Sequence, residues 1–149
     1  SFNANITTQK MLADDTIWAA DNGCFSQPGK YTDEGFLAWL DGMGRQGCLF
    51  AVAPDVVGDA AATFDRSLPM LSKIRSLEYP VAFVGQDGAT INGLPWRQFD
   101  ALFIGGTTKW KTSQEAGDLI AEAKRRNKWV HEGSCRAWGR QCGWNTYSV

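Results

Sequence analysis

The apolar residues of the chain gather into six short runs, and in most of these the apolar positions are continuous rather than alternating. Strands that are apolar throughout are buried on both faces, which is typical of a parallel sheet whose strands are joined by helices. We therefore predict six parallel strands. They begin near residues 17, 48, 81, 101, 129 and 146.

Three stretches between these runs have the apolar spacing of a helix. The first opens at Thr32 and ends near Gly44, and in the second Pro69 predicts a kink or a restart. The third follows Thr112-x-x-Glu115, the pattern of a capping box. The apolar stripes are Phe36, Leu37, Leu40 and Met43; Phe64, Leu68, Leu71 and Ile74; and Ala116, Leu119, Ile120 and Ala123.

Alternating strands and helices are compatible with two architectures, an open doubly wound sheet and a (β/α)8 barrel. The sequence has neither a G-x-G-x-x-G nor a Walker phosphate loop, which disfavours a nucleotide-binding open sheet. A complete barrel usually has about 250 residues, whereas this chain has 149. We therefore predict an α/β fold of the (β/α)8 TIM-barrel type with parallel strands. It would be a single domain over residues 1–149, either compact or truncated at both ends.

Composition narrows the class of protein. Hydrophobic residues make up 44% of the chain and charged residues 21%, which excludes disordered and fibrous chains. We expect no membrane partner, because no apolar stretch approaches the ~20 residues of a spanning helix. The net charge of −1 provides no overall attraction to nucleic acid. The basic residues Lys124–Arg126 and Lys128 close the third helical stretch, where they either complement the helix dipole or contact phosphates.

The four cysteines include no C-x-x-C pair, so the sequence predicts neither a zinc knuckle nor a thioredoxin-type site. Cys24 and Cys48 adjoin predicted strands, and we expect them to be reduced, buried thiols in a cytoplasmic protein. His131, Cys135 and Cys142 lie close together in the sequence but lack a visible fourth ligand. We therefore expect no metal and no cofactor.

Polar residues and glycines follow five of the predicted strands. Because the carboxyl ends of parallel strands share one edge, we expect these groups to converge on one pocket. Carboxylates there can transfer protons or accept from N–H groups, a glutamine amide offers a donor and an acceptor, and paired glycines expose backbone N–H groups. This set suits a flat heterocycle; the alternative is that these residues only start turns and cap helices. They are Asp21-Asn22-Gly23, Pro54-Asp55, Gln86-Asp87-Gly88, Gly105-Gly106-Thr107-Thr108 and His131-Glu132-Gly133.

Several of these segments resemble, in order, motifs of the tRNA-guanine (queuine) transglycosylases. Asp21–Ser26 resembles the family's D-S-G-G-F-Q, Gln86–Gly88 its Q-G-G, and Ile104–Gly106 its glycine loop. Asp55 stands where the family has the acidic residue after its next active-site strand. The likeness is closer still to phage and bacterial 7-deazaguanine DNA transglycosylases (DpdA-like). It rests on the segments W-A-A-D-N-G-C-F, A-P-D-V-V-G-D-A and K-W-V-H. The resemblance runs from Trp18 to Val149.

The resemblance implies a base-exchange glycosyltransferase, in which guanine is replaced by a 7-deazaguanine through a covalent glycosyl-enzyme. Asp21 would be the general acid/base, and Asp55 would hold the N1–H and the exocyclic amine of the base. Gln86 and the N–H of Gly106, beside Gly105, would contact its O6. The nucleophilic aspartate of the family is expected just beyond Val149.

The resemblance also implies the partners: a guanine or 7-deazaguanine base, and DNA or, alternatively, tRNA as acceptor. The structural zinc of the tRNA-acting relatives is not expected here, and a homo-oligomer is compatible with those relatives. Lys109, Trp110 and Lys111 form either a nucleic-acid contact or a surface loop before a helix. Two other functions stay open, a non-catalytic or fragmentary barrel that binds a nucleobase or a partner, and a barrel hydrolase with Asp21 and Asp55 as its carboxylate pair.

Overall fold

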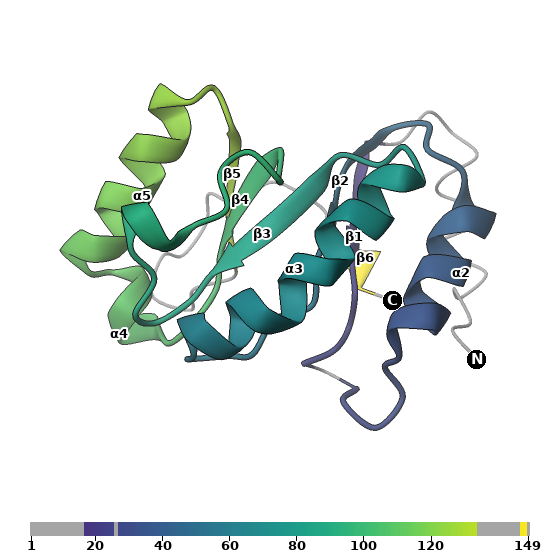
Figure 1. Ribbon diagram of the computed structural model, residues 1–149, viewed down its shortest axis with the longest axis horizontal. Coiled ribbons are helices and arrows are strands. Elements are labelled where there is room, and N and C mark those ends of the chain that lie inside the picture. The colour runs from purple at the N-terminus through teal and green to yellow at the C-terminus, as the bar shows by residue number, and fades with distance from the viewer. Residues whose placement is uncertain (1–16, 26, 134–146, 149) are drawn as a thin grey trace.

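The computed structural model describes residues 17–25, 27–133 and 147–148, and it has the alternating strands and helices that the sequence predicts (Figure 1). All six predicted strands are present, within two residues of their expected starts. The strands are β1 (Trp18–Asp21), β2 (Cys48–Val52), β3 (Val81–Gly85), β4 (Ala101–Ile104), β5 (Trp129–Glu132) and β6 (Tyr147–Ser148). The helices are α2 (Asp33–Met43), α3 (Ala60–Ser76), the 3-10 turn η1 (Ile91–Gly93), α4 (Thr108–Lys111) and α5 (Gln114–Arg125).

The strands form one sheet in the order β5-β4-β3-β2-β1-β6, and every pair of neighbours is parallel. From β1 to β5 each strand is added on the same side of the one before it. Because crossovers between parallel strands are right-handed, this order puts the connecting helices on a single face of the sheet. An open doubly wound sheet would instead change direction and carry helices on both faces.

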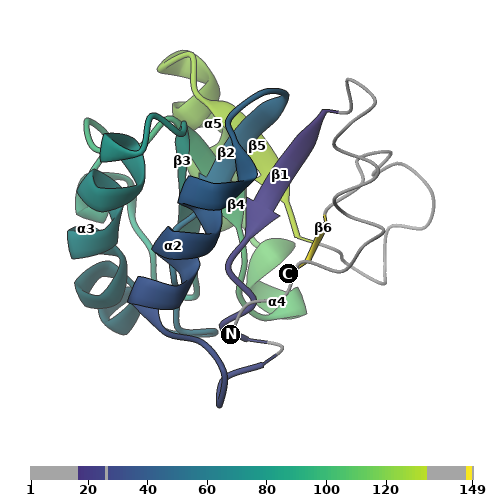
Figure 2. The same ribbon diagram turned by 90° about the vertical axis from the view of Figure 1, so that its right-hand side faces the viewer.

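The buried apolar residues confirm this one-sided arrangement. A large cluster of buried residues joins α2, α3 and α5 to one face of the sheet. Figure 2 shows α2 and α3 together on one side of β1. A second cluster lies on the opposite face, and within the described ranges it contains strand residues alone. That second face is lined by Ala19, Phe50, Val52, Ala82, Val84 and Ala101, with Leu49 and Phe103 packed against them.

The sheet is strongly curled about this second face. Phe50 lies on β2 and His131 on β5, with β3 and β4 between them in the sheet. In a flat sheet three strand spacings would separate them by about 14 Å, yet their ring centroids are 5.9 Å apart. The sheet therefore forms a half-barrel, with the helices on its convex side.

Short polar side chains begin the longer helices. The side chains of Thr32 and Asp59 accept from backbone N–H groups in the first turns of α2 and α3. The cap of α5 is Ser113, so the prediction of Thr112 as capping residue is wrong by one position. Thr112 instead completes α4, where its hydroxyl donates to the carbonyl oxygens of that short helix.

The helix α3 continues through Pro69 to Ser76, so the chain does not restart there as one reading of the sequence predicted. None of the helices in the described ranges combines the length and apolar character that crossing a lipid bilayer requires.

Candidate functional site

Four of the five polar segments predicted from the sequence lie at the carboxyl edge of the half-barrel. The prediction that His131 and Glu132 follow their strand is wrong, because β5 continues through Glu132. Asp21 ends β1, Asp55 follows β2, Gln86 follows β3 and Gly105 follows β4. Because all pairings are parallel, these positions share one edge of the sheet. The structure brings Asp55 and Gln86 into direct contact, and Asp21 is close enough to influence the Asp55 carboxylate electrostatically.

The Gln86 amide is a buried bridge between two loops. Its Nε2 donates to Asp55 Oδ2 at 2.5 Å, and its Oε1 accepts from the backbone N–H of Gly58 at 3.0 Å. The side chain is only 1% exposed. Gly105 is required beside it, since a Cβ there would lie 2.8 Å from Gln86 Nε2 and 2.6 Å from Val84 Cγ1.

Cys24 also belongs to the site, although the sequence predicts it only as a buried thiol beside a strand. Its Sγ donates to Asp55 Oδ1 at 3.4 Å. Asn22 places it there, because the Asn22 Oδ1 accepts from the Cys24 backbone N–H at 2.7 Å while its Nδ2 donates to the carbonyl oxygens of Val52 and Ala53. The polar segment after β1, next to a thiol, was the available signal for this role.

Burial raises the pKa of the Asp55 carboxyl above its ordinary value, and the nearby charge of Asp21 raises it further. Hydrogen bonds from Cys24 and Gln86, together with the positive charge of Arg66, oppose that rise. Arg66 also donates to the Asp55 backbone carbonyl at 2.9 Å. Burial raises the pKa of the Cys24 thiol to about 11, so at neutral pH it is a protonated donor.

Asp21 is half-buried, and its carboxylate forms a hydrogen bond within its own loop. Its Oδ1 accepts from the Gly23 backbone N–H at 3.1 Å, the geometry of an Asx turn. One carboxylate oxygen is therefore held locally. The turn fixes Asp21 at the edge of the sheet beside the loop that carries Cys24.

A second polar contact joins the loops after β3 and β4. The Asp87 carboxylate accepts from the Thr107 hydroxyl at 2.5 Å and from its backbone N–H at 2.9 Å. Slight desolvation works against it, but these hydrogen bonds lower the pKa of Asp87. Gly106 has a φ of +84° and faces Asp87 so closely that a side chain would collide with the carboxylate.

Beside this contact lies an open pocket of about 440 Å³. Its lining mixes acidic, basic and hydroxyl side chains with one tryptophan. The lining residues include Asp87, Thr90, Thr107, Lys109, Trp110, Ser113 and Glu115.

Lys109, Trp110 and Lys111 belong to the short helix α4 rather than to a loop. Trp110 is 8% exposed and packs into the apolar core, so little of its ring is open to stacking. Lys109 is exposed and lines the pocket, and Lys111 is half-buried. Of the three, Lys109 has the exposure that a phosphate contact requires.

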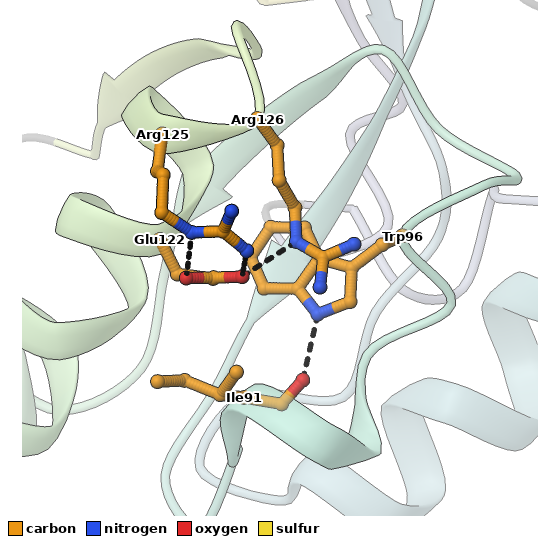
Figure 3. Close-up of polar contacts among 5 residues, drawn as sticks. All are labelled: Ile91, Trp96, Glu122, Arg125 and Arg126. Carbon is orange, nitrogen blue, oxygen red and sulfur yellow. Dashed lines mark hydrogen bonds and ion pairs between the residues drawn. The ribbon is translucent and has the colours of Figure 1, made fainter.

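The basic cluster at the end of α5 makes contacts within the protein (Figure 3). Arg125 and Arg126 both pair with the Glu122 carboxylate, at 2.5 Å and 2.7 Å. The guanidinium of Arg126 also lies 4.9 Å from the ring centroid of Trp96. Lys128 donates to the carbonyl oxygen of Phe99 at 2.7 Å. These contacts give the cluster a role in attaching α5 to the loop before β4.

His131 points to the concave face of the sheet, with its ring 5.9 Å from Phe50 and 4.9 Å from Phe103. Burial there lowers its pKa. Cys135 and Cys142, considered with it as metal ligands, lie outside the described residues. Within the part of the chain that the structure describes, no three His, Cys, Asp or Glu side chains are grouped as metal ligands would be.

Fold and site together define the class of protein: an α/β half-barrel of parallel strands with a polar cluster at the carboxyl ends of its strands. Comparison with known proteins adds no relative, since no family model, no curated protein and no solved structure matches the chain.

Proposed function

We propose that this chain is the core of a base-exchange glycosyltransferase that replaces guanine with a 7-deazaguanine in nucleic acid, with DNA as the favoured acceptor and tRNA as the other. The observation that carries the proposal is the Asp55 carboxylate, held between Gln86 and Cys24 at the carboxyl edge of a parallel half-barrel. The resemblance of the strand-end segments to transglycosylase motifs supports the same assignment.

The proposed fold is a (β/α)8 barrel completed by strands beyond those described. The sequential strand order, the single helical face and the curl of the sheet support a barrel. The pairing of β1 with β2 on one side and β6 on the other also fits, because every strand of a closed barrel has a neighbour on each side.

Asp55 is the residue that we assign to base recognition. Its ionised carboxylate accepts from the N1–H and the 2-amino group of guanine, a donor pair that adenine lacks. The backbone N–H of Gly106 is assigned to the O6 of the base. Because charge-assisted hydrogen bonds in a partly buried site are strong, this pairing supplies most of the selectivity.

Asp21 is assigned to proton transfer. In the reaction that the resemblance implies, a carboxylate nucleophile attacks C1′ as the bond from C1′ to guanine N9 breaks. Asp21 gives its proton to the departing guanine. It then takes a proton from N9 of the incoming 7-deazaguanine, which displaces the carboxylate from C1′ and retains the configuration. We place this chemistry in the cytoplasm, where Cys24 and Cys48 stay reduced.

Calorimetric titration of the chain with guanine, 7-cyano-7-deazaguanine (preQ0) and adenine tests the assignment. Guanine and preQ0 share the N1–H and 2-amino edge, so both are expected to bind saturably, while adenine is expected to bind at least tenfold more weakly. Equal affinity for adenine, or no binding of guanine by the folded chain, contradicts the proposal.

Incorporation of radiolabelled guanine then distinguishes the acceptors. Label entering guanine-containing DNA but not tRNA supports the DNA-acting class. Binding of the base without incorporation into either favours a barrel that binds a nucleobase without turnover.

A further inference from the structure

Both polar atoms of the Gln86 amide are already used inside the protein. The oxygen accepts from Gly58 N–H at 3.0 Å and the nitrogen donates to Asp55 Oδ2 at 2.5 Å. The Gly105 backbone lies so close to the amide that a Cβ there would be 2.8 Å from the nitrogen, and Gln86 is 1% exposed. Asp55, which is only partly buried, is therefore more accessible than Gln86 to a ligand at the sheet edge.

Turning the amide towards a ligand would have a large cost. The Gly58 N–H would lose its acceptor and the partly buried Asp55 oxygen would lose its donor. A buried polar group left without its partner is costly, and more so when it is charged. The fixed amide is therefore better suited to hold Asp55 than to contact the base.

We infer that Gln86 is a positioning residue, which acts on the base only by orienting the Asp55 carboxylate, with the Cys24 thiol as the second donor. The inference rests on the proposed function and refines it. Gln86 would govern recognition of the 2-amino edge of guanine, read by Asp55, and not recognition of O6.

The same contacts predict how base binding depends on pH. The charged and titratable groups that face Asp55 are Asp21 from β1, Cys24 from the loop after it and Arg66 from α3. Replacing Gln86 by Glu removes a donor and adds a carboxylate, which favours protonation of Asp55. Because the protonated carboxyl no longer accepts two hydrogen bonds, guanine binding in Gln86→Glu is lost at a higher pH than in the wild type.

Comparing the binding of guanine with that of two analogues distinguishes a positioning role of Gln86 from direct contact with the base. Hypoxanthine lacks the 2-amino group of guanine, and 6-thioguanine replaces O6 by a weaker acceptor. Their affinities are measured for the wild type, Gln86→Leu and Gln86→Glu. Gln98→Leu, at an exposed residue in the loop before β4, is the matched control. Thermal unfolding of each variant confirms that it is folded.

If Gln86 positions Asp55, the preference for guanine over hypoxanthine falls at least fivefold in Gln86→Leu and stays unchanged in Gln98→Leu. The ratio of guanine to 6-thioguanine affinity stays within twofold of the wild type. A guanine to 6-thioguanine ratio that collapses in Gln86→Leu, with the 2-amino preference intact, would show direct contact with O6 and overturn the inference.

A second measurement needs no ligand and keeps the two proposals distinguishable. The Asp55 side-chain carboxyl carbon is titrated by NMR in the wild type and in Gln86→Leu. Loss of the donor is expected to move the midpoint to higher pH, and an unchanged midpoint would refute positioning by Gln86. If that midpoint moves but the wild type binds no guanine, the proposed function fails while the structural role of Gln86 stands.

Discussion

Asp55 shows how a buried carboxylate can remain an acceptor. Burial and the charge of Asp21 favour its protonated form, while the donors Cys24 and Gln86 favour the ionised form. The balance depends on both donors being in place, because each holds one carboxylate oxygen. Small changes in either donor should therefore alter what Asp55 can bind.

Cys24 should be a slow nucleophile. Burial raises its pKa to about 11, so the thiolate becomes abundant only near that pH, and alkylation should accelerate as the pH rises towards it. At pH 8 we expect iodoacetamide to label the Cys24 peptide about 100-fold more slowly than in the denatured chain, as followed by mass spectrometry. Equal rates in the folded and denatured chain would contradict the burial of this thiol.

The sequence predicts which residues form most of the site, but it does not predict how these residues contact one another. Asp21, Asp55 and Gln86 each follow an apolar run, and parallel topology alone brings such positions to one edge. The contact between Gln86 and Asp55 depends on the course of the loop that ends at Gly58, which no periodicity describes. The sequence predicts Cys24 only as a core residue, because a thiol behaves as a small apolar side chain.

At the scale of elements, Tyr79 ties α2 to the sheet from the turn before β3. Its hydroxyl lies 2.6 Å from the carbonyl oxygen of Leu40 and 2.8 Å from that of Gly44, at the end of α2. The side chain is 1% exposed. The last carbonyls of a helix have no partner within the helix, so a buried hydroxyl there satisfies them.

Replacing Tyr79 by Phe should destabilise the fold by about 1–3 kcal/mol, because the buried Leu40 carbonyl and the partly buried Gly44 carbonyl lose the hydroxyl that they share. Urea unfolding measures this change. Tyr31→Phe is the control, since the Tyr31 hydroxyl donates to Asp33 at a half-buried position and its loss should cost less. A smaller loss in Tyr79→Phe than in Tyr31→Phe would contradict the assignment.

Glu122 should make the attachment of α5 sensitive to acid. Hydrogen bonds from Arg125 and Arg126 lower the pKa of Glu122 to about 2. A lowered carboxyl pKa stabilises the fold above the unfolded-state value of about 4.3, and this contribution is lost as the pH falls towards 2. Glu122→Gln should therefore be less stable than the wild type at pH 7, and the gap should close between about pH 4 and pH 2.

Thermal unfolding across this pH range measures the gap. Glu115→Gln, in the first turn of the same helix, is the control and should show a smaller gap at pH 7. A gap for Glu122→Gln that is independent of pH would contradict the role of its ionised form.

At the scale of the whole molecule, the curl of the sheet creates the concave face and brings the strand ends around one edge. Small residues on that face, among them Ala19, Ala82 and Ala101, leave room for the sheet to bend inward. Phe50 and His131 meet across it from strands that are not neighbours. This contact is a direct consequence of the barrel-like shape.

A double-mutant cycle between Phe50 and His131 tests the curl. Phe50→Ala should cost about 3–5 kcal/mol as a core truncation, whereas Phe25→Ala, at a residue 74% exposed, should cost about 0.5 kcal/mol or less. Because the rings touch, Phe50→Ala and His131→Ala should show a coupling of about 0.5 kcal/mol or more by urea unfolding. Strictly additive effects would indicate a flat sheet.

The curl itself could not be predicted from the sequence. The six apolar runs predict the number of strands and their parallel direction. The curvature depends on which small side chains face the concave side, and this follows from the register of the strand pairs. Trp110 is a similar case. Because lysines flank it, the sequence predicts that Trp110 lies on the surface. In the structure its indole packs into the space that Gly85 and Gly106 leave.

The most direct test of the account is calorimetric titration of guanine into the wild type, Asp55→Asn and Asp65→Asn. Asp65 is an exposed carboxylate on α3 and serves as the matched control. We predict saturable binding to the wild type and to Asp65→Asn, and affinity about 10- to 100-fold weaker in Asp55→Asn, because a charged hydrogen-bond acceptor is lost. Undiminished binding to a folded Asp55→Asn chain would contradict the central claim that Asp55 recognises the base.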